Sequence, residues 1–118
     1  MGELFKKMNL KQKDIVLLHF PFAHLKASKI RPAVVVSNND LNNKGRDCLF
    51  IPLTSVPKKE PYSLQINQED LSAGKLYFTS RARADKITAI ERSLVIEKIG
   101  ILNEDTMNQV KSKIISLF

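Results

Sequence analysis

Arginine, aspartate and hydroxyl side chains occur in short segments of this sequence that could bind and cleave a phosphodiester. Residues 80–87 read Ser-Arg-Ala-Arg-Ala-Asp-Lys-Ile. In an extended chain Arg81, Arg83 and Asp85 share one face, because successive side chains of a strand alternate. Arginines can hold a phosphate, and a carboxylate can accept a proton. The same spacing is equally typical of a solvated ladder of ion pairs.

A second segment mixes aromatic and basic residues between two apolar runs. Between runs 15–18 and 33–36 lie rings, a histidine and cations: Phe20, Phe22, His24, Lys26, Lys29 and Arg31. Cations can contact phosphates while rings stack on bases, at roughly 1–3 kcal/mol per base. This pattern indicates a site for single-stranded nucleic acid. The alternative is that the rings lie in the core and the lysines face solvent.

Two hydroxyls close a third apolar run. Thr54 and Ser55 follow Ile51-Pro52-Leu53 directly. Side chains at the end of a strand can point into a cleft while the sheet holds their backbone. The alternative is that both residues simply begin the turn that Pro57 continues.

The sequence lacks the usual signatures of a metal or nucleotide site. One cysteine and two histidines are too few for a zinc site by themselves. There is no glycine-rich phosphate loop and no serine nucleophile elbow. We therefore predict no cofactor and no metal, and chemistry by Arg, Asp, Thr, Ser and His. Cys48, inside the apolar run Cys48-Leu49-Phe50-Ile51, is predicted to be a core residue.

Length and charge narrow the class of protein. The chain has 118 residues, the size of one domain, and a formal net charge of +7. That excess favours an acidic partner such as nucleic acid, although an ordinary basic surface would give the same total. We expect a polar leader at residues 1–12 and one domain at 13–118. A single cysteine, no signal peptide and no apolar run of about 20 residues predict a cytoplasmic protein without a membrane segment.

Short apolar runs separated by turn formers predict a mainly β fold. Strands are expected at 14–20, 32–38, 47–54, 62–66, 76–88 (one longer strand with a bend) and 99–102. Asn67 and Gly74 suggest one helical turn between them. Asn103 should cap a closing helix over 104–117, whose apolar positions recur at helical spacing. About five to seven strands with one helix favour a small barrel or half-open sheet.

Six short motifs occur in the order and spacing of a known family. They are Asp14-Ile-Val, Phe20-Pro-Phe22, Arg31-Pro-Ala-Val-Val-Val-Ser-Asn38, Pro52-Leu-Thr-Ser55, Pro61-Tyr-Ser-Leu64 and Arg83-Ala-Asp-Lys-Ile87. With the terminal helix after Ile99-Gly-Ile-Leu102, residues 13–118 resemble the PemK/MazF toxins of bacterial type II toxin–antitoxin systems. One departure is Lys13, where that family commonly has glycine.

The resemblance implies both a fold and an activity. The fold is an SH3-like barrel with a C-terminal helix, as in CcdB, PemK and MazF, usually assembled as a homodimer. The activity is that of an mRNA interferase, an endoribonuclease that cuts single-stranded RNA at selected sequences without a metal and is inhibited by a cognate antitoxin. The expected products carry a 2′,3′-cyclic phosphate and a 5′-hydroxyl.

The resemblance also offers two overlapping sets of catalytic residues. One set matches Arg31 and Thr54, and the other matches Arg83 and Asp85 together with the loop residue His24. Arg31 could stabilise the phosphate charge, but its high pKa makes it a poor base. Either Asp85 or His24 is the easier proton acceptor. The remaining candidates would bind RNA: Phe20, Phe22, Lys26, Lys29, Ser55 and Arg81.

Two other functions remain open from the sequence. The same barrel resembles the CcdB toxins, which poison DNA gyrase and cut no RNA. A barrel that binds RNA but has lost catalysis is the third candidate. The Arg-Pro motif, Thr54 and the Arg-x-Asp segment favour the nuclease.

Overall fold

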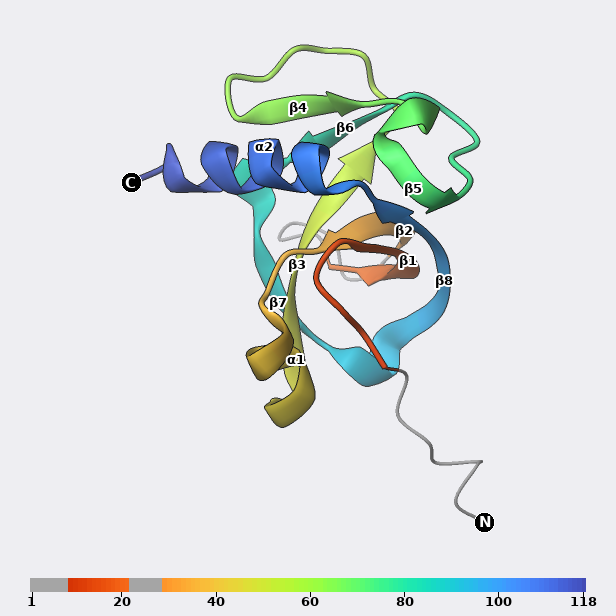
Figure 1. The fold of residues 1–118 in the computed structure, drawn as a ribbon, viewed down its shortest axis with the longest axis vertical. Coiled ribbons are helices and arrows are strands. Elements are labelled where there is room, and N and C mark those ends of the chain that lie inside the picture. Colours follow the sequence, from red (N-terminus) through yellow and green to blue (C-terminus); the bar gives the residue numbers. More distant parts are fainter. Residues whose placement is uncertain (1–8, 22–28) are drawn as a thin grey trace.

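The computed structural model describes residues 9–21 and 29–118, and in that part of the chain a curled antiparallel sheet forms most of the molecule (Figure 1). Its strands are β1 Asp14–Phe20, β2 Lys29–Val35, β3 Asp47–Thr54, β4 Ser63–Ile66, β5 Leu71–Gly74, β6 Ser80–Arg83, β7 Thr88–Glu91 and β8 Val95–Leu102. The strand order is β4-β6-β3-β2-β1-β8-β5, and β7 pairs with β3 off this path. The helices are α1 Asn39–Lys44 and α2 Glu104–Ile115. Single 3-10 turns are η2 Gln68–Asp70, η3 Ala84–Lys86 and η4 Arg92–Leu94.

Most predicted elements are confirmed. Strands β1 and β3 have the expected bounds, β4 begins one residue later than expected, and β2 is shifted toward the N-terminus. Helix α2 begins after Asn103, whose Oδ1 accepts a hydrogen bond from the Thr106 amide at 2.8 Å. Met107 and Val110 of α2 are buried and Ile114 is partly buried against the same core, which confirms the predicted apolar stripe as far as Ile114, while the helix ends at Ile115, two residues before the expected end. The expected mainly β barrel with a closing helix is therefore correct.

The prediction of one bent strand over 76–88 is wrong. The chain leaves the sheet at η3 and divides this region between β6 and β7. Both strands pair with β3, but β6 meets its end, with Leu53 opposite Ala82, and β7 meets its beginning, with Phe50 opposite Thr88. The turn η3 between them lets β6 and β7 pair with successive parts of β3 while the sheet curls.

Three other boundaries differ from expectation. The predicted helical turn at 67–74 is η2 followed by β5, so Gly74 ends a strand. Strand β8 begins at Val95, four residues before the expected start. A short helix, α1, forms in a segment expected to be only a turn, because the Asn38 side chain caps it by accepting from the Leu41 amide at 2.8 Å.

Gly74 is required by the packing of β5 on β8. Its φ is +84°, and it pairs with Gly100 of β8. A Cβ at position 74 would lie 2.2 Å from the Ile99 carbonyl oxygen and 2.3 Å from the Gly100 Cα. Only glycine combines this backbone conformation with so close an approach.

Lys13 occupies the turn before β1 where the resemblance leads one to expect glycine. Its φ is +87°, in the left-handed region that side chains disfavour. Its amide donates to the Val35 carbonyl at 3.0 Å, and its own carbonyl accepts from the Leu102 amide at 2.9 Å. These backbone bonds hold the turn in place, so this chain keeps the glycine-type conformation with a lysine.

The two faces of the sheet pack into separate cores within the described residues. One cluster fills the concave side and includes Leu18, Ala33, Cys48 and Phe50. The other lies between the sheet and α2, above β3 in Figure 1. Cys48 is fully buried, and burial raises the pKa of its thiol, which confirms it as a core residue.

Candidate active site

The register of the sheet aligns several of the predicted site residues in one row. Thr54 at the end of β3 pairs with Arg81 of β6, and Arg81 pairs with Gln65 of β4. On the other side of β3, Ala33 pairs with Pro52, and Arg31 lies two residues before Ala33 on the same face of β2. Neighbouring strands are about 4.8 Å apart, and paired side chains point to the same face. Arg31, Thr54 and Arg81 therefore share one face on three adjacent strands.

Arg83 adds a second guanidinium from β6 to this face. It lies two residues after Arg81 and pairs with Ser63 of β4, while the intervening Ala82 is buried against the opposite core. This explains the alternating Arg-Ala-Arg pattern, because the alanine faces the tightly packed side. We call the surface formed by Arg31, Thr54, Arg81 and Arg83 the cationic face.

The cationic face lies on the same side of the sheet as the concave core, at the ends of the strands. Further along the same strands, this side of the sheet carries Ala33 and Phe50, both fully buried. Arg31, Arg81 and Arg83 are half-buried, so their apolar stems lie against the protein. Apolar packing at one end holds the strands rigidly, and the charged groups project from the rim.

Arg83 and Asp85 form a bidentate ion pair. The Arg83 Nε donates to one carboxylate oxygen at 2.9 Å, and Nη2 donates to the other at 2.8 Å. These hydrogen bonds lower the pKa of Asp85 and raise that of Arg83. A carboxylate held ionised in this way is a weak proton acceptor near neutral pH. Asp85 lies in η3, beyond the end of β6, so the prediction that all three charged residues lie on one strand is wrong.

Arg81 is held by a residue that the sequence did not single out as functional. Its Nε donates to the Ser63 hydroxyl oxygen at 2.9 Å, and its Nη2 to the Ser63 carbonyl at 3.4 Å. Ser63 is itself buried and donates to the Glu60 carbonyl at 2.8 Å. The signal in the sequence is the alternation of residues 62–66, which places Ser63 and Gln65 opposite Leu64.

Thr54 begins the turn after β3, and its hydroxyl keeps a proton that it can donate. Its Oγ1 accepts a hydrogen bond from the Val56 amide at 3.2 Å, so it does begin the turn after β3. A hydroxyl that accepts one bond keeps its own proton to donate. The side chain can therefore orient a phosphate oxygen while its backbone is fixed in the sheet. Ser55, the next residue, is exposed.

The aromatic and basic residues predicted to bind RNA do not all lie where the sequence suggested. Phe20 is only 3% exposed and packs in the concave core, so the prediction that its ring stacks on a base is wrong. Lys29 is exposed and lies two residues before Arg31 on the same face of β2. Phe22, His24 and Lys26 lie outside the described residues. The other histidine, His19, is exposed on β1 opposite Ile30, on the other face of the sheet.

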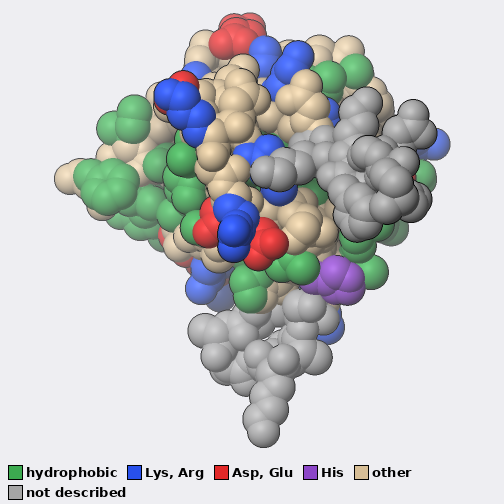
Figure 2. All heavy atoms as spheres, turned by 90° about the horizontal axis from the view of Figure 1, so that it is seen from below, with side chains coloured by type: hydrophobic (Ala, Val, Ile, Leu, Met, Phe, Trp, Pro, Cys, Tyr) green, Lys and Arg blue, Asp and Glu red, His purple; other side chains and the backbone are tan. Residues whose placement is uncertain are grey.

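The total charge of the chain does not by itself locate this site. On the face drawn in Figure 2, Lys and Arg side chains occur in several separate places, and acidic side chains lie beside some of them. Across residues 9–21 and 29–118, no three His, Cys, Asp or Glu side chains gather as metal ligands would. No helix in the same residues is long and apolar enough to cross a membrane.

The sequence of residues 11–118 matches the model of one protein family, described as PemK-like, MazF-like toxins of type II toxin–antitoxin systems. The chain belongs to this family. The match covers nearly all of the chain, including β1 to α2. No curated protein matches the sequence significantly.

Solved structures share the fold of this MazF-like chain. An endoribonuclease from a Mycobacterial species aligns with a TM-score of 0.75 at 17% identity, covering 94% of this chain and 92% of that one. MazE–MazF from Deinococcus radiodurans aligns with a TM-score of 0.75 at 22% identity, covering 93% and 96%. MazF from the same organism aligns with a TM-score of 0.73 at 24% identity, covering 93% and 96%.

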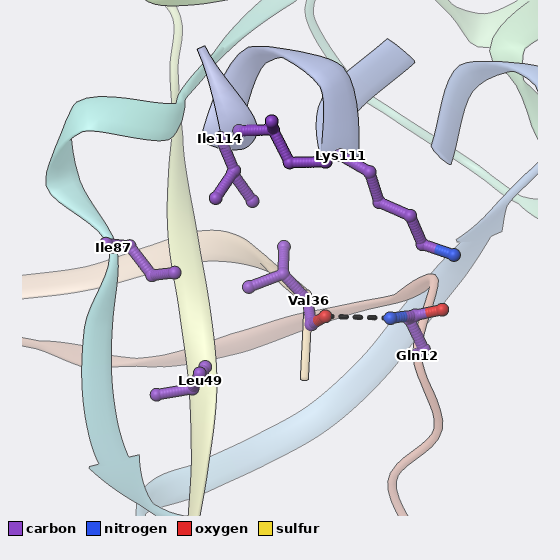
Figure 3. A pocket seen from close by; sticks show the side chains of 7 residues that line it. Gln12, Val36, Leu49, Ile87, Lys111 and Ile114 are labelled. Carbon is purple, nitrogen blue, oxygen red and sulfur yellow. Dashed lines mark hydrogen bonds between the residues drawn. The ribbon is translucent and has the colours of Figure 1, made fainter. Parts of the chain in front are cut away.

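An apolar groove lies beside α2, away from the residues proposed from the sequence. It encloses about 250 Å³ between β3, η3 and the last turns of α2. In Figure 3, Val36, Leu49, Ile87 and Ile114 approach one another, and Lys111 extends to the edge near Gln12. The Gln12 amide donates to the Val36 carbonyl at 2.8 Å. The helical spacing of α2 predicted its buried stripe. It did not predict the groove beside that stripe, because the groove depends on how the helix crosses the sheet.

Proposed function

We propose that this chain is the toxin of a type II toxin–antitoxin pair and acts as an endoribonuclease on single-stranded messenger RNA in the cytoplasm. The observation that supports the proposal is the cationic face, where Arg31, Thr54, Arg81 and Arg83 lie on the same face of the neighbouring strands β2, β3 and β6. Fixed guanidinium groups beside a hydroxyl suit the crowded phosphate of a cleavage transition state. Two fold neighbours described as endoribonucleases support the same reaction class.

The reaction that fits this arrangement is internal transfer within the RNA. The 2′-oxygen attacks the adjacent phosphorus, the bond from phosphorus to the 5′-oxygen breaks, and a 2′,3′-cyclic phosphate and a 5′-hydroxyl result. A base takes the proton of the 2′-hydroxyl, and an acid returns one to the 5′-oxygen. Arg31 stabilises the charge on the phosphate, and Thr54 orients one of its oxygens.

Asp85 serves better as a positioning residue than as the base. Its two oxygens accept hydrogen bonds from Arg83, and these lower its pKa. Two of the five guanidinium donors of Arg83 serve this pair, which orients the group toward a phosphate. The proton transfer is then assigned to His24, because an imidazole titrates near neutral pH. His24 lies outside the described residues, so this assignment rests on its chemistry alone.

An antitoxin is the first proposed protein partner, and the charge of the chain favours it. One fold neighbour is described as an endoribonuclease in complex with its cognate antitoxin, and another as MazE–MazF. A net charge of +7 would attract an acidic antitoxin segment as it attracts RNA.

We assign the apolar groove to a second copy of this chain. Ile115 at its rim is 69% exposed, and Phe118 three residues later is fully exposed. An apolar groove with an exposed apolar side chain at its rim can be covered by the same groove of a second copy across a two-fold axis.

The test is cleavage of a labelled single-stranded RNA by the purified protein in excess EDTA. We expect cutting to persist and the new ends to carry a cyclic phosphate, identified by its resistance to phosphatase until acid treatment. Cutting that stops with EDTA and returns with Mg²⁺ would contradict the mechanism. Binding without cutting would instead support the inactive RNA-binding module, and trapping of gyrase on DNA would support a CcdB-like toxin.

A further inference from the structure

Two adjacent aromatic rings project from the loop between β5 and β6. Tyr77 is 76% exposed and Phe78 is 72% exposed, and nothing in the reaction proposed above uses them. The Lys75 Nζ lies 5.5 Å from the centre of the Tyr77 ring, within the range of a cation–π contact. Exposed rings beside a cation are a feature that a folded core does not require.

The loop is anchored at both ends. The Leu76 amide donates to the Gln68 side-chain oxygen at 2.8 Å, and the Lys75 amide donates to the Ile99 carbonyl at 3.1 Å. At the other end, the Ser80 hydroxyl donates to the Phe78 carbonyl at 3.1 Å. The rings are therefore presented by a constrained backbone, which lowers the entropy cost of binding through them.

The loop leads directly into the cationic face. Strand β6 begins at Ser80, and Arg81 follows at once. Arg81 is three positions after Phe78 in the sequence, so their Cα atoms are at most about 11 Å apart. A chain bound at Arg81 through a phosphate can thus reach the rings with a neighbouring nucleotide.

We propose that Tyr77 and Phe78 form a stacking platform for bases of single-stranded RNA that flank the cleaved phosphate. The inference rests on the proposed ribonuclease function and adds to it a binding subsite. Rings with a cation on either side, Lys75 before them and Arg81 after them, match alternating bases and phosphates. The loop continues directly into β6 and the cationic face, so one RNA strand can contact both, and this continuity favours RNA over a lipid surface.

The experiment measures binding of a long RNA made uncleavable by 2′-O-methyl groups, using fluorescence anisotropy. The variants are Tyr77→Ala, Phe78→Ala and the double variant, with Ile96→Ala as a control because Ile96 is an exposed apolar residue on β8. We expect each ring variant to bind about 5- to 100-fold more weakly, the range that loss of one base–ring stack gives. Tyr77→Trp and Phe78→Trp should bind as the wild type does. Circular dichroism verifies that each variant is folded.

Salt dependence separates stacking from charge. The ring variants should shift log K without changing its slope against log salt, because no phosphate contact is removed. Lys75→Ala should reduce that slope by about 0.7, the value for one contact on a single strand. A changed slope in the ring variants would overturn the stacking role.

Two further outcomes distinguish failure of this inference from failure of the proposed function. If the wild type binds and cuts RNA and the alanine variants bind equally well, the platform is wrong and the ribonuclease stands. If the wild type does not bind RNA at all, the proposed function itself fails. If the ring variants bind RNA as the wild type does but no longer bind phosphatidylglycerol vesicles that the wild type binds, the rings contact a membrane and the RNA platform is wrong.

Discussion

Arg83 donates to both carboxylate oxygens of Asp85, at 2.9 and 2.8 Å, from positions only two residues apart. The pair joins the last residue of β6 to the turn η3, where the chain leaves the sheet. The pair therefore fixes a guanidinium on the cationic face, and its hydrogen bonds lower the pKa of Asp85, one of the two candidate bases.

The pH profile of cleavage tests the role of Asp85. If Asp85 only positions Arg83, Asp85→Asn should lower kcat/KM by about tenfold, the loss of one oriented charge contact, and leave the limbs of the pH profile in place. His24→Gln should instead remove the limb that reports the base. Loss of that limb in Asp85→Asn would show that Asp85 accepts the proton.

The same pair makes a small pH-dependent contribution to stability. Because the folded pKa of Asp85 is depressed, its stabilisation is present above the ordinary carboxyl pKa and is lost as pH falls through the folded value. Both side chains are partly exposed, at 22% and 31%, so we expect no more than about 1 kcal/mol. Urea unfolding of wild type and Asp85→Asn should differ by this amount at pH 7 and converge near pH 2. A difference that persists at pH 2 would contradict this origin.

Arg31 is expected to be essential for the chemical step. Arg31→Ala should lower the single-turnover rate by about 10²–10³, the usual loss for one preorganised charge-stabilising donor.

Two further variants separate orientation from binding. Thr54→Ala should lower the rate less than Arg31→Ala does if the hydroxyl only orients phosphate. Lys26→Ala should weaken RNA binding in a salt-dependent way and spare the rate at saturation.

Lys44→Ala is the matched control, because Lys44 is an exposed cation of α1, which precedes the beginning of β3, whereas the cationic face lies at the end of β3. Wild-type cleavage by Arg31→Ala, with an unchanged circular dichroism spectrum, would move the active site to the Arg83–Asp85 pair.

The apolar groove predicts the assembly state. Ile115→Glu places a charge at its rim, where burial against a second copy would be costly. We expect this variant to sediment as a monomer at micromolar concentration while the wild type sediments as a dimer. Ile96→Glu, an equally drastic change at an exposed position of β8, should remain dimeric. A monomeric wild type would remove the assignment of the groove to a second copy.

Lys13 offers a test of backbone strain. At its φ of +87°, Lys13→Gly should be more stable than Lys13→Ala by about 1 kcal/mol, since both lose the side-chain bond to Glu104 but only alanine keeps the strain. Thermal or urea unfolding of the two variants gives the difference directly. Equal stabilities would show that the turn relaxes on substitution.

The sequence by itself determined the elements that depend on local order. Apolar runs bounded by turn formers located β1 and β3, alternation located β4, and helical spacing located α2, because each signal depends only on residues close in the sequence. Asn103 marked the start of α2, and the ordered motifs identified the family that the matched residues 11–118 confirm. Residue types and spacing singled out Arg31, Thr54, Arg81 and Arg83 as candidates, and the catalytic roles expected of Arg31, Thr54 and Arg83 came from the family resemblance.

The tertiary structure decided what depends on contacts between distant segments. The break between β6 and β7 follows from both strands pairing with β3, and no local signal records which partner a segment will find. Phe20 is a core residue and Tyr77 and Phe78 are exposed, because the curl of the sheet determines which rings are covered. The cationic face exists only where the pairing of β4, β6, β3 and β2 sets one register, since residues far apart in the chain become neighbours through hydrogen bonds between strands.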